Sequence, residues 1–205
     1  MNYQQIKTNL NKLPVFFTSD LIKIDKDFHL QRLSEWQKKK EIKKIKRGLY
    51  IFSDKDIDEY YLFLIANVML QPSYVSLNSA LSIYNIIPET VFEISSVTSR
   101  KTSYYKTEFA RFNYRSIKPS LLFGYKLVER NGFVYKIASL EKTVLDYLYF
   151  NKKADSIDYF EEYRFNKEML NSQLDIDKFK RYLKAFNNNS LKKRANTFLE
   201  YIQND

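Results

Sequence analysis

Seven cations and one acid, Glu41, occupy the ten positions from 38 to 47 of this chain. Lysine and arginine neutralise phosphate groups, so a cluster of this density could hold a nucleic-acid backbone. The run stops at Gly48, and the β-prone residues Leu49 to Phe52 follow it, which predicts two short strands joined by a tight turn. A run of like charge is also typical of an ordinary solvated surface. The cations are Lys38, Lys39, Lys40, Lys43, Lys44, Lys46 and Arg47.

A second basic segment, SRKTSYYKTEFARFNYRSIK, interleaves cations with aromatic residues. Such a mixture can bind single-stranded nucleic acid or RNA by stacking. In alternating strands, however, aromatic side chains more often face inward while the cations are solvated. Both interpretations stay open, and in the functional one this surface would contact flanking nucleic acid. The candidate binding residues here are Arg100, Lys101, Lys106, Arg111 and Arg115.

Catalytic chemistry finds little support in the sequence. Glu141, Lys142 and Asp146 in SLEKTVLD have near one-turn spacing, but adjacent helical residues point to different faces, which favours a helix start with ordinary surface charges. The three glycines form no phosphate-cradling loop, and no D…ExK nuclease pattern is present. With no cysteine and one histidine, His29, we expect no disulfide, metal ligand, catalytic residue or cofactor.

The charge of the chain is concentrated near its start. The formal net charge is +10, and residues 1–53 contribute twelve cations and five acids to it, or +7. This excess predicts an anionic partner. The first residues lack the apolar core of a signal peptide, and polar residues and Pro72 interrupt the uncharged stretch 60–88, which predicts buried helices rather than a membrane span. We expect a cytoplasmic protein with no membrane partner.

Three short helices are predicted ahead of the basic ribbon. The spacing of Ile6, Leu10 and Leu13 predicts the first, and FFTSDLIKI the second, with Thr18 or Ser19 as its N-cap. The third is predicted over about 27–40, with Leu30, Leu33 and Trp36 facing inward. Three helices followed by a two-stranded ribbon have the order of a winged helix-turn-helix, in which the third helix enters the major groove.

The remainder of the chain predicts a second unit. Helices are expected near 57–70, 77–84 and 139–150, and strands at 91–98, 109–117, 122–129 and 133–137, with Asn131-Gly132 as a hairpin turn. Residues 155–205 predict two or three amphipathic helices. The predicted fold class is α+β: a winged helix-turn-helix over 1–53, then a larger mixed α/β domain over 54–205 with a small, mainly antiparallel sheet and C-terminal helices.

If the first unit binds double-stranded DNA, base reading falls to exposed side chains early in the third helix. Arginine can pair two donors with guanine, and glutamine can read adenine. The ribbon cations would contact phosphates and set the register. The predicted DNA-binding residues are Thr18, His29, Gln31, Arg32, Lys38, Lys39, Lys40, Lys43, Lys44, Lys46 and Arg47.

Five motifs occur in a suggestive order: FFTSDLIKI, LSEWQKKKEIKKIKRGLYIF, PSYVSLNSALSIYNIIPE, EISSVTSRKT and YKIASLEKTVLDYLY. Together, over about residues 16–149, they resemble the AbiEi family, the antitoxin-regulator half of AbiE abortive-infection (type IV) toxin–antitoxin pairs. One departure lies in WQKKKEI, where the family pattern leads us to expect a glycine.

The resemblance implies a winged-helix domain that binds inverted repeats in the promoter of its own operon and represses it. The larger domain is then the antitoxin part, which counters a nucleotidyltransferase-like toxin without a tight complex. The hypothesis from sequence is thus a non-enzymatic DNA-binding antitoxin and transcriptional repressor in phage defence. The alternatives are a nucleic-acid-processing enzyme, or its accessory subunit, with a winged-helix targeting domain, and a stand-alone transcriptional regulator without a toxin.

Overall fold

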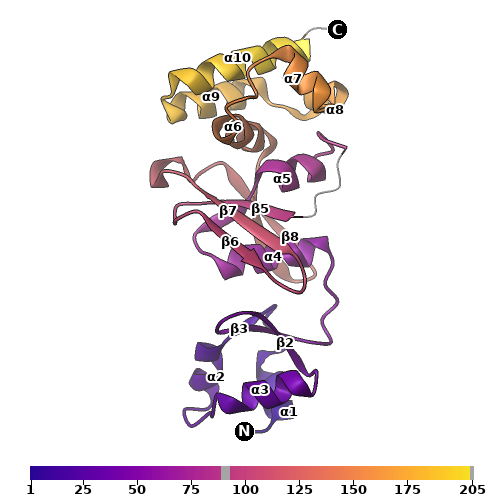
Figure 1. Cartoon of the computed structure of the whole chain (residues 1–205), viewed down its shortest axis with the longest axis vertical. Coiled ribbons are helices and arrows are strands. Elements are labelled where there is room, and N and C mark those ends of the chain that lie inside the picture. Colours follow the sequence, from indigo (N-terminus) through magenta and orange to yellow (C-terminus); the bar gives the residue numbers. More distant parts are fainter. Residues whose placement is uncertain (89–92, 204–205) are drawn as a thin grey trace.

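The computed structural model describes residues 1–88 and 93–203 and belongs to the α+β class. Its elements lie in layers along the long axis, with the N-terminal helices at one end and the C-terminal helices at the other (Figure 1). We call α1 to β3 the head and α4 to α10 the body. Val91 and Phe92, the first two residues of the strand predicted at 91–98, lie outside the described residues.

The head contains three helices and a three-stranded antiparallel sheet of order β1-β3-β2. Asp20 accepts a hydrogen bond from the backbone N–H of Phe17 (2.8 Å), which is how the second helix starts. The elements are α1 (Tyr3–Leu10), β1 (Phe16–Phe17), α2 (Thr18–Ile24), α3 (Gln31–Lys38), β2 (Ile42–Lys46) and β3 (Leu49–Phe52).

Three details of the predicted head were wrong. The first helix ends at Leu10, so Leu13, expected to belong to it, lies outside the helix and is 39% exposed. Thr18 and Ser19 are not the N-cap of α2, because the cap position falls on Phe17 and Asp20 binds back to it. The third helix starts at Gln31 rather than near 27, and Leu30, expected inside, is 49% exposed. Phe28 takes the inner position instead, with its ring 5.5 Å from that of Trp36. A turn across residues 25–30 shifts the helical phase, which spacing alone does not reveal.

The central strand of the small sheet, β3, is buried on both faces. Phe16, Tyr50 and Phe52 pack with the helices of the head. Leu49 and Ile51, on the opposite face, belong to a cluster that includes α4 and the larger sheet. All four residues of β3 are therefore buried, and the sheet joins the head to the body. The division into separate domains over 1–53 and 54–205 stays a prediction.

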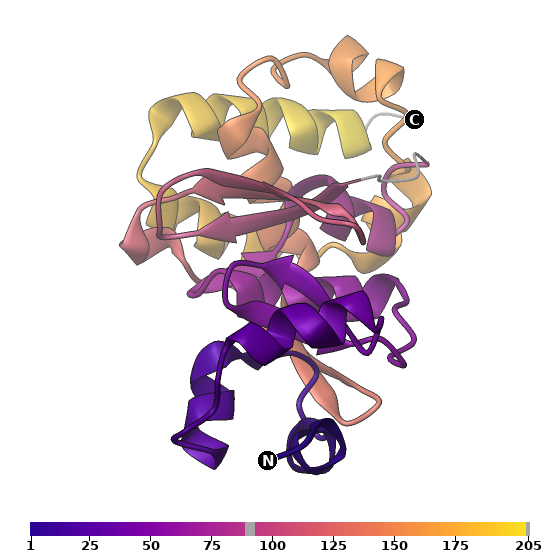
Figure 2. The same cartoon turned by 60° about the horizontal axis from the view of Figure 1, so that its bottom comes forward.

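The body is built on a six-stranded sheet of order β6-β7-β5-β4-β9-β8. Helix α4 packs on one face of it, α5 and α6 cover the other, and the C-terminal helices α9 and α10 pack on α6 as a further layer (Figures 1 and 2). The elements are α4 (Glu59–Met69), β4 (Ser73–Val75), α5 (Leu77–Ile83), β5 (Glu93–Thr98), β6 (Ser103–Lys106), β7 (Arg111–Ser116), the 3-10 helix η1 (Pro119–Leu121), β8 (Tyr125–Arg130), β9 (Phe133–Ala138), α6 (Leu140–Phe150), α7 (Ile157–Glu162), α8 (Lys167–Gln173), α9 (Ile176–Phe186) and α10 (Asn189–Gln203).

Most predicted elements of the body are confirmed, including the hairpin turn at Asn131-Gly132, where both residues have positive φ. The sheet is larger and more mixed than expected, because β4 pairs with β9, and β5 with β7, in parallel. Sequence reasoning missed β4, which has three residues after Pro72, and β6, an edge strand. No helix in the described ranges is long and apolar enough to cross a membrane.

Candidate nucleic-acid interface

The residues predicted to read bases lie at the start of α3, but in two different environments. His29, in the preceding turn, and Gln31, the first residue of α3, are both exposed. The guanidinium of Arg32 instead lies 5.8 Å from the ring centre of Phe28 and 5.5 Å from that of Trp36, and it donates to the carbonyl of Met1. Arg32 therefore packs the head together in this conformation, whereas Gln31 projects freely.

The three lysines at the far end of α3 are exposed and make no ion pair within the described residues. Lys40 has a φ of +57°, a left-handed conformation that favours glycine. It lies within WQKKKEI, the segment where the resemblance leads us to expect a glycine. The chain therefore places a cation at a left-handed backbone position.

The ribbon formed by β2 and β3 carries its four cations in two pairs. Lys44 and Arg47 are exposed, and we call them the outer pair. Lys43 is also exposed, but its ammonium lies over the ring of Phe109 (5.3 Å to the centre). Lys46 lies over Tyr105 (5.3 Å) and donates to the carbonyl of Met69 (2.5 Å). Its partial burial lowers its pKa, because burial disfavours the charged ammonium. Lys43 and Lys46, the docked pair, hold the ribbon against the body.

The ribbon turn is also held to the head. The backbone N–H of Thr18 donates to the carbonyl of Gly48 (3.0 Å), and Gly48 has a φ of +78°. Thr18 is half-buried, so the structure places it where it positions the turn. Ile42 faces the head and Ile45 faces the body, as alternation along a strand gives for residues three apart, and a β-bulge shifts the pairing register between Lys44 and Lys46.

The second basic segment forms the β6–β7 hairpin and the turn before it. Lys106 and Arg111 are exposed and lie directly opposite each other in the register. Most aromatic residues of the segment face inward, among them the buried Phe112 and Tyr114, as the solvated-surface interpretation expects. Tyr104 is the exception, with 54% of it exposed.

The other cations of this segment are partly engaged. Arg100 donates to the carbonyl of Gln71 (3.3 Å), and Arg115 lies 4.9 Å from the ring centre of Phe150, whereas Lys101 is exposed. The ribbon docks on this same hairpin through Tyr105 and Phe109. The cations of the ribbon and those of the hairpin therefore lie on neighbouring elements. Sequence reasoning missed the docking role of these two aromatics, whose only signal was their place beside the predicted strands.

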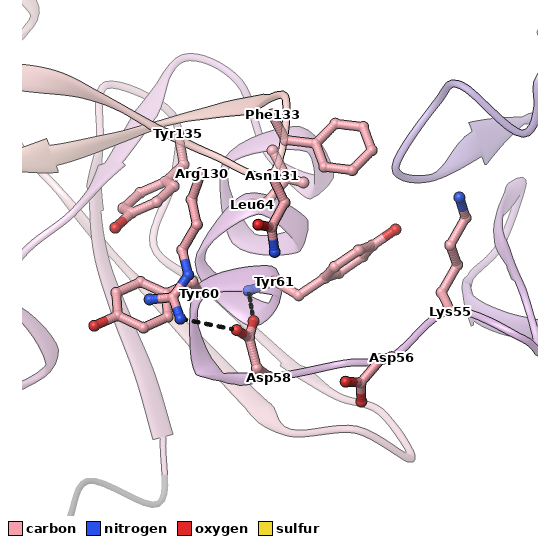
Figure 3. Close-up of a pocket in the computed structure, with 10 residues that line it drawn as sticks. All are labelled: Lys55, Asp56, Asp58, Tyr60, Tyr61, Leu64, Arg130, Asn131, Phe133 and Tyr135. Atoms are coloured by element: carbon pink, nitrogen blue, oxygen red, sulfur yellow. Dashed lines mark hydrogen bonds and ion pairs between the residues drawn. The ribbon is translucent and has the colours of Figure 1, made fainter.

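A pocket of about 180 Å³ marks the junction between head and body (Figure 3). Asp58 caps α4 by accepting from the N–H of Tyr61 (2.8 Å) and pairs with Arg130 (3.7 Å), whose guanidinium stacks on Tyr60 at 3.6 Å. The hydroxyl of Tyr61 donates to the carbonyl of Pro14 in the head (2.5 Å), and burial raises its pKa to about 12. These contacts tie the β8–β9 hairpin, α4 and the head together.

The interpretation of Glu141 and Lys142 as surface charges was wrong, because both are buried. Lys142 pairs with Asp146 and donates to the hydroxyl of Tyr74 (2.8 Å). Asp146 also accepts from Tyr74 (3.0 Å) and from Ser76 (2.9 Å). Burial lowers the pKa of Lys142 and raises that of Asp146. The cluster has no exposed surface and joins α6 to β4, so its geometry is that of a buried structural network.

Glu141 makes a separate contact, with the C-terminal helices. Its carboxylate pairs with Lys178 of α9 (2.8 Å) and accepts from the N–H of Asp175 (3.3 Å). Burial alone would raise the pKa of Glu141, but these hydrogen bonds outweigh it and the pKa lies below its usual value.

In comparisons with known proteins, no family model matches the chain and no curated protein matches it.

Proposed function

We propose that this protein is a DNA-binding antitoxin and transcriptional autorepressor of an AbiE-like, type IV toxin–antitoxin operon. The head is a winged helix-turn-helix, with α3 as the recognition helix and the β2–β3 ribbon as the wing. The body is the antitoxin-type domain. The proposal places the protein in the cytoplasm and gives it no enzymatic step.

The order of elements in the head supports its role as a DNA reader. Helix, strand, two helices and a two-stranded ribbon follow each other as in winged helices that dock on duplex DNA. The exposed start of α3 is the part that would reach base edges in the major groove, where Gln31 could pair with adenine. Lys38, Lys39 and Lys40 at the other end of α3 would then lie near a phosphate backbone.

The observation that carries the proposal is the unpaired positive charge that spans the ribbon and the β6–β7 hairpin. Lys44 and Arg47 have no acidic partner in the described residues, and neither do Lys106 and Arg111. Lys106 and Arg111 are like charges directly opposite each other on a sheet, which is unfavourable, and Glu93 opposite Arg111 on β5 offsets only part of the local positive charge. A polyanion would relieve this repulsion. The cations of the ribbon and of the hairpin lie on neighbouring elements, so both sets would contribute to the positive field that attracts a polyanion.

The antitoxin role and the inverted-repeat operator rest on the sequence resemblance. They imply that the partner gene encodes a nucleotidyltransferase-like toxin that the body counters without a tight complex. The stand-alone regulator differs from this proposal only in lacking that gene.

Two experiments test the proposal. A gel-shift titration with the DNA upstream of the chain's own reading frame should give a specific complex, while a shuffled duplex of equal length binds more weakly. Co-expression with the product of the adjacent gene should relieve growth arrest, and the body alone should suffice. Equal affinity for both duplexes would contradict the repressor role. If the protein does not relieve the growth arrest, or if the product of the adjacent gene is not toxic, the antitoxin role is wrong and the stand-alone regulator is favoured.

A further inference from the structure

Strand β8 is a free edge of the six-stranded sheet, and it carries exposed apolar side chains. It is the outermost strand of the order β6-β7-β5-β4-β9-β8. All of its residues are exposed except Val128, which is half-buried. Leu127 is 65% exposed, and its diagonal neighbour Val134 on β9 is 49% exposed. An open edge with apolar side chains is a template for pairing with another strand.

The hydrogen bonds made by β9 residues show which residues of β8 point their backbone N–H and C=O groups away from β9. The N–H of Lys136 donates to Oδ1 of Asn67 (2.5 Å), and its carbonyl accepts from Nδ2 of the same residue (3.3 Å). Lys136 therefore points its polar groups away from β8. The N–H of Ser139 donates to the carbonyl of Gly124 (2.8 Å), so Gly124 and Ser139 form a hydrogen-bonded pair. Counting pairs along the strand from there also makes Leu127–Lys136 a pair without mutual hydrogen bonds.

In an antiparallel pair, residues that exchange hydrogen bonds alternate with residues that do not. Leu127 lies opposite Lys136, so the Leu127–Lys136 pair is of the second kind. The N–H and C=O groups of Leu127, and by the same period those of Tyr125 and Glu129, point outward from the free edge. The edge thus presents three outward-facing residues to a partner strand.

We propose that a second copy of this chain pairs with β8 in the antiparallel sense, about a two-fold axis at Leu127. In this register Leu127 faces Leu127 of the second copy, Tyr125 faces Glu129, and Lys126 faces Val128. All three outward-facing residues exchange hydrogen bonds, and the apolar Leu127 side chains cover each other.

Charge excludes the neighbouring registers. Opposite residues must share a face of the sheet, so the axis can move only to Lys126 or Val128. An axis at Lys126 sets that cation against itself, and an axis at Val128 sets Lys126 against Arg130. Both place like charges opposite each other, which destabilises a strand pair. The axis at Leu127 is free of such a clash, so the edge selects one register.

The chain has no cysteine, which allows a clean cross-linking test. Opposite Cα atoms of a hydrogen-bonded pair lie about 5.5 Å apart, within the range of a disulfide. The full-length Leu127→Cys variant, oxidised without DNA, should form a covalent dimer. Tyr104→Cys is the matched control, because Tyr104 is also exposed, at 54%, but lies on the other edge strand, β6.

Sedimentation velocity gives the second measurement. The unmodified chain should show a concentration-dependent dimer, Leu127→Lys should shift it to monomer, and Tyr104→Lys should not. Monomers at every soluble concentration, or equal cross-linking of the two cysteine variants, would overturn the proposal. Both measurements omit DNA, so the dimer stands or falls separately from the proposed DNA binding.

Discussion

The two cation pairs of the ribbon should respond differently to alanine substitution. The outer pair, Lys44 and Arg47, is exposed and unpaired, so we expect it to contact phosphates. The docked pair, Lys43 and Lys46, is occupied by Phe109, Tyr105 and the carbonyl of Met69. The test compares the double variants Lys44→Ala/Arg47→Ala and Lys43→Ala/Lys46→Ala, which remove the same formal charge.

The expected magnitude follows from counterion release. Each phosphate contact contributes about 0.9 to the slope of log affinity against log salt, so losing the outer pair should flatten the slope by about 1.8. If wild type and variant have equal affinity at 1 M salt, a slope difference of about 1.8 makes the affinity of the variant on the order of 60-fold weaker at 0.1 M salt, on any duplex. The docked pair should change the slope less. Its loss should instead lower the free energy of unfolding by roughly 1–3 kcal/mol, through lost cation–π contacts and one hydrogen bond.

The assay is fluorescence anisotropy with the upstream duplex and a shuffled duplex, titrated at several salt concentrations. Urea unfolding of each variant supplies the stability arm. If the two double variants flatten the slope equally, the distinction between outer and docked cations is wrong. If neither changes the slope, the ribbon does not lie on DNA.

Three further predictions concern single residues. Gln31→Ala should weaken binding to the operator by about 1–3 kcal/mol and spare shuffled DNA, whereas Arg32→Ala should lower stability by about 1 kcal/mol because its stacking is lost; the reverse pattern in anisotropy and urea unfolding would make Arg32 the reader. Lys40→Gly should raise stability by up to about 1 kcal/mol, because it relieves a left-handed residue, while Lys39→Gly, at a φ of −77°, should lower it; a loss at both sites counts against backbone strain. The pKa of Glu141 in the folded protein lies below the unfolded value of 4.5, so its carboxylate contributes stability that is present above pH 4.5 and lost as the pH falls through the folded pKa. The difference in unfolding free energy between wild type and Glu141→Gln should therefore close in acid, and a difference that does not change with pH would contradict the ion pair.

The buried pair in α6 shows how charge can mislead sequence reasoning. Lys142 and Asp146 are one turn apart and look like a surface ion pair. The structure places both in the core, because Tyr74 and Ser76 supply the hydrogen bonds that a buried carboxylate requires. Those partners lie about 70 positions earlier in the chain, and no local pattern announces them.

The sequence by itself determined what depends on neighbouring residues. Apolar periodicity located most helices and strands, Asn131-Gly132 defined a hairpin turn, and composition placed the excess charge in the first quarter of the chain. The candidate cations could also be named, since lysine and arginine within a run are visible in the letters.

Only the tertiary structure decided which of those residues are free. Lys43 and Lys44 are adjacent, alike and both exposed, yet only Lys43 lies over an aromatic ring of the body. The mixed strand order, the stacking of Arg32 on Phe28 and Trp36, and the outward edge of β8 depend on tertiary contacts in the same way. The physical reason is that these outcomes depend on contacts between segments far apart in the chain, which local propensity does not encode.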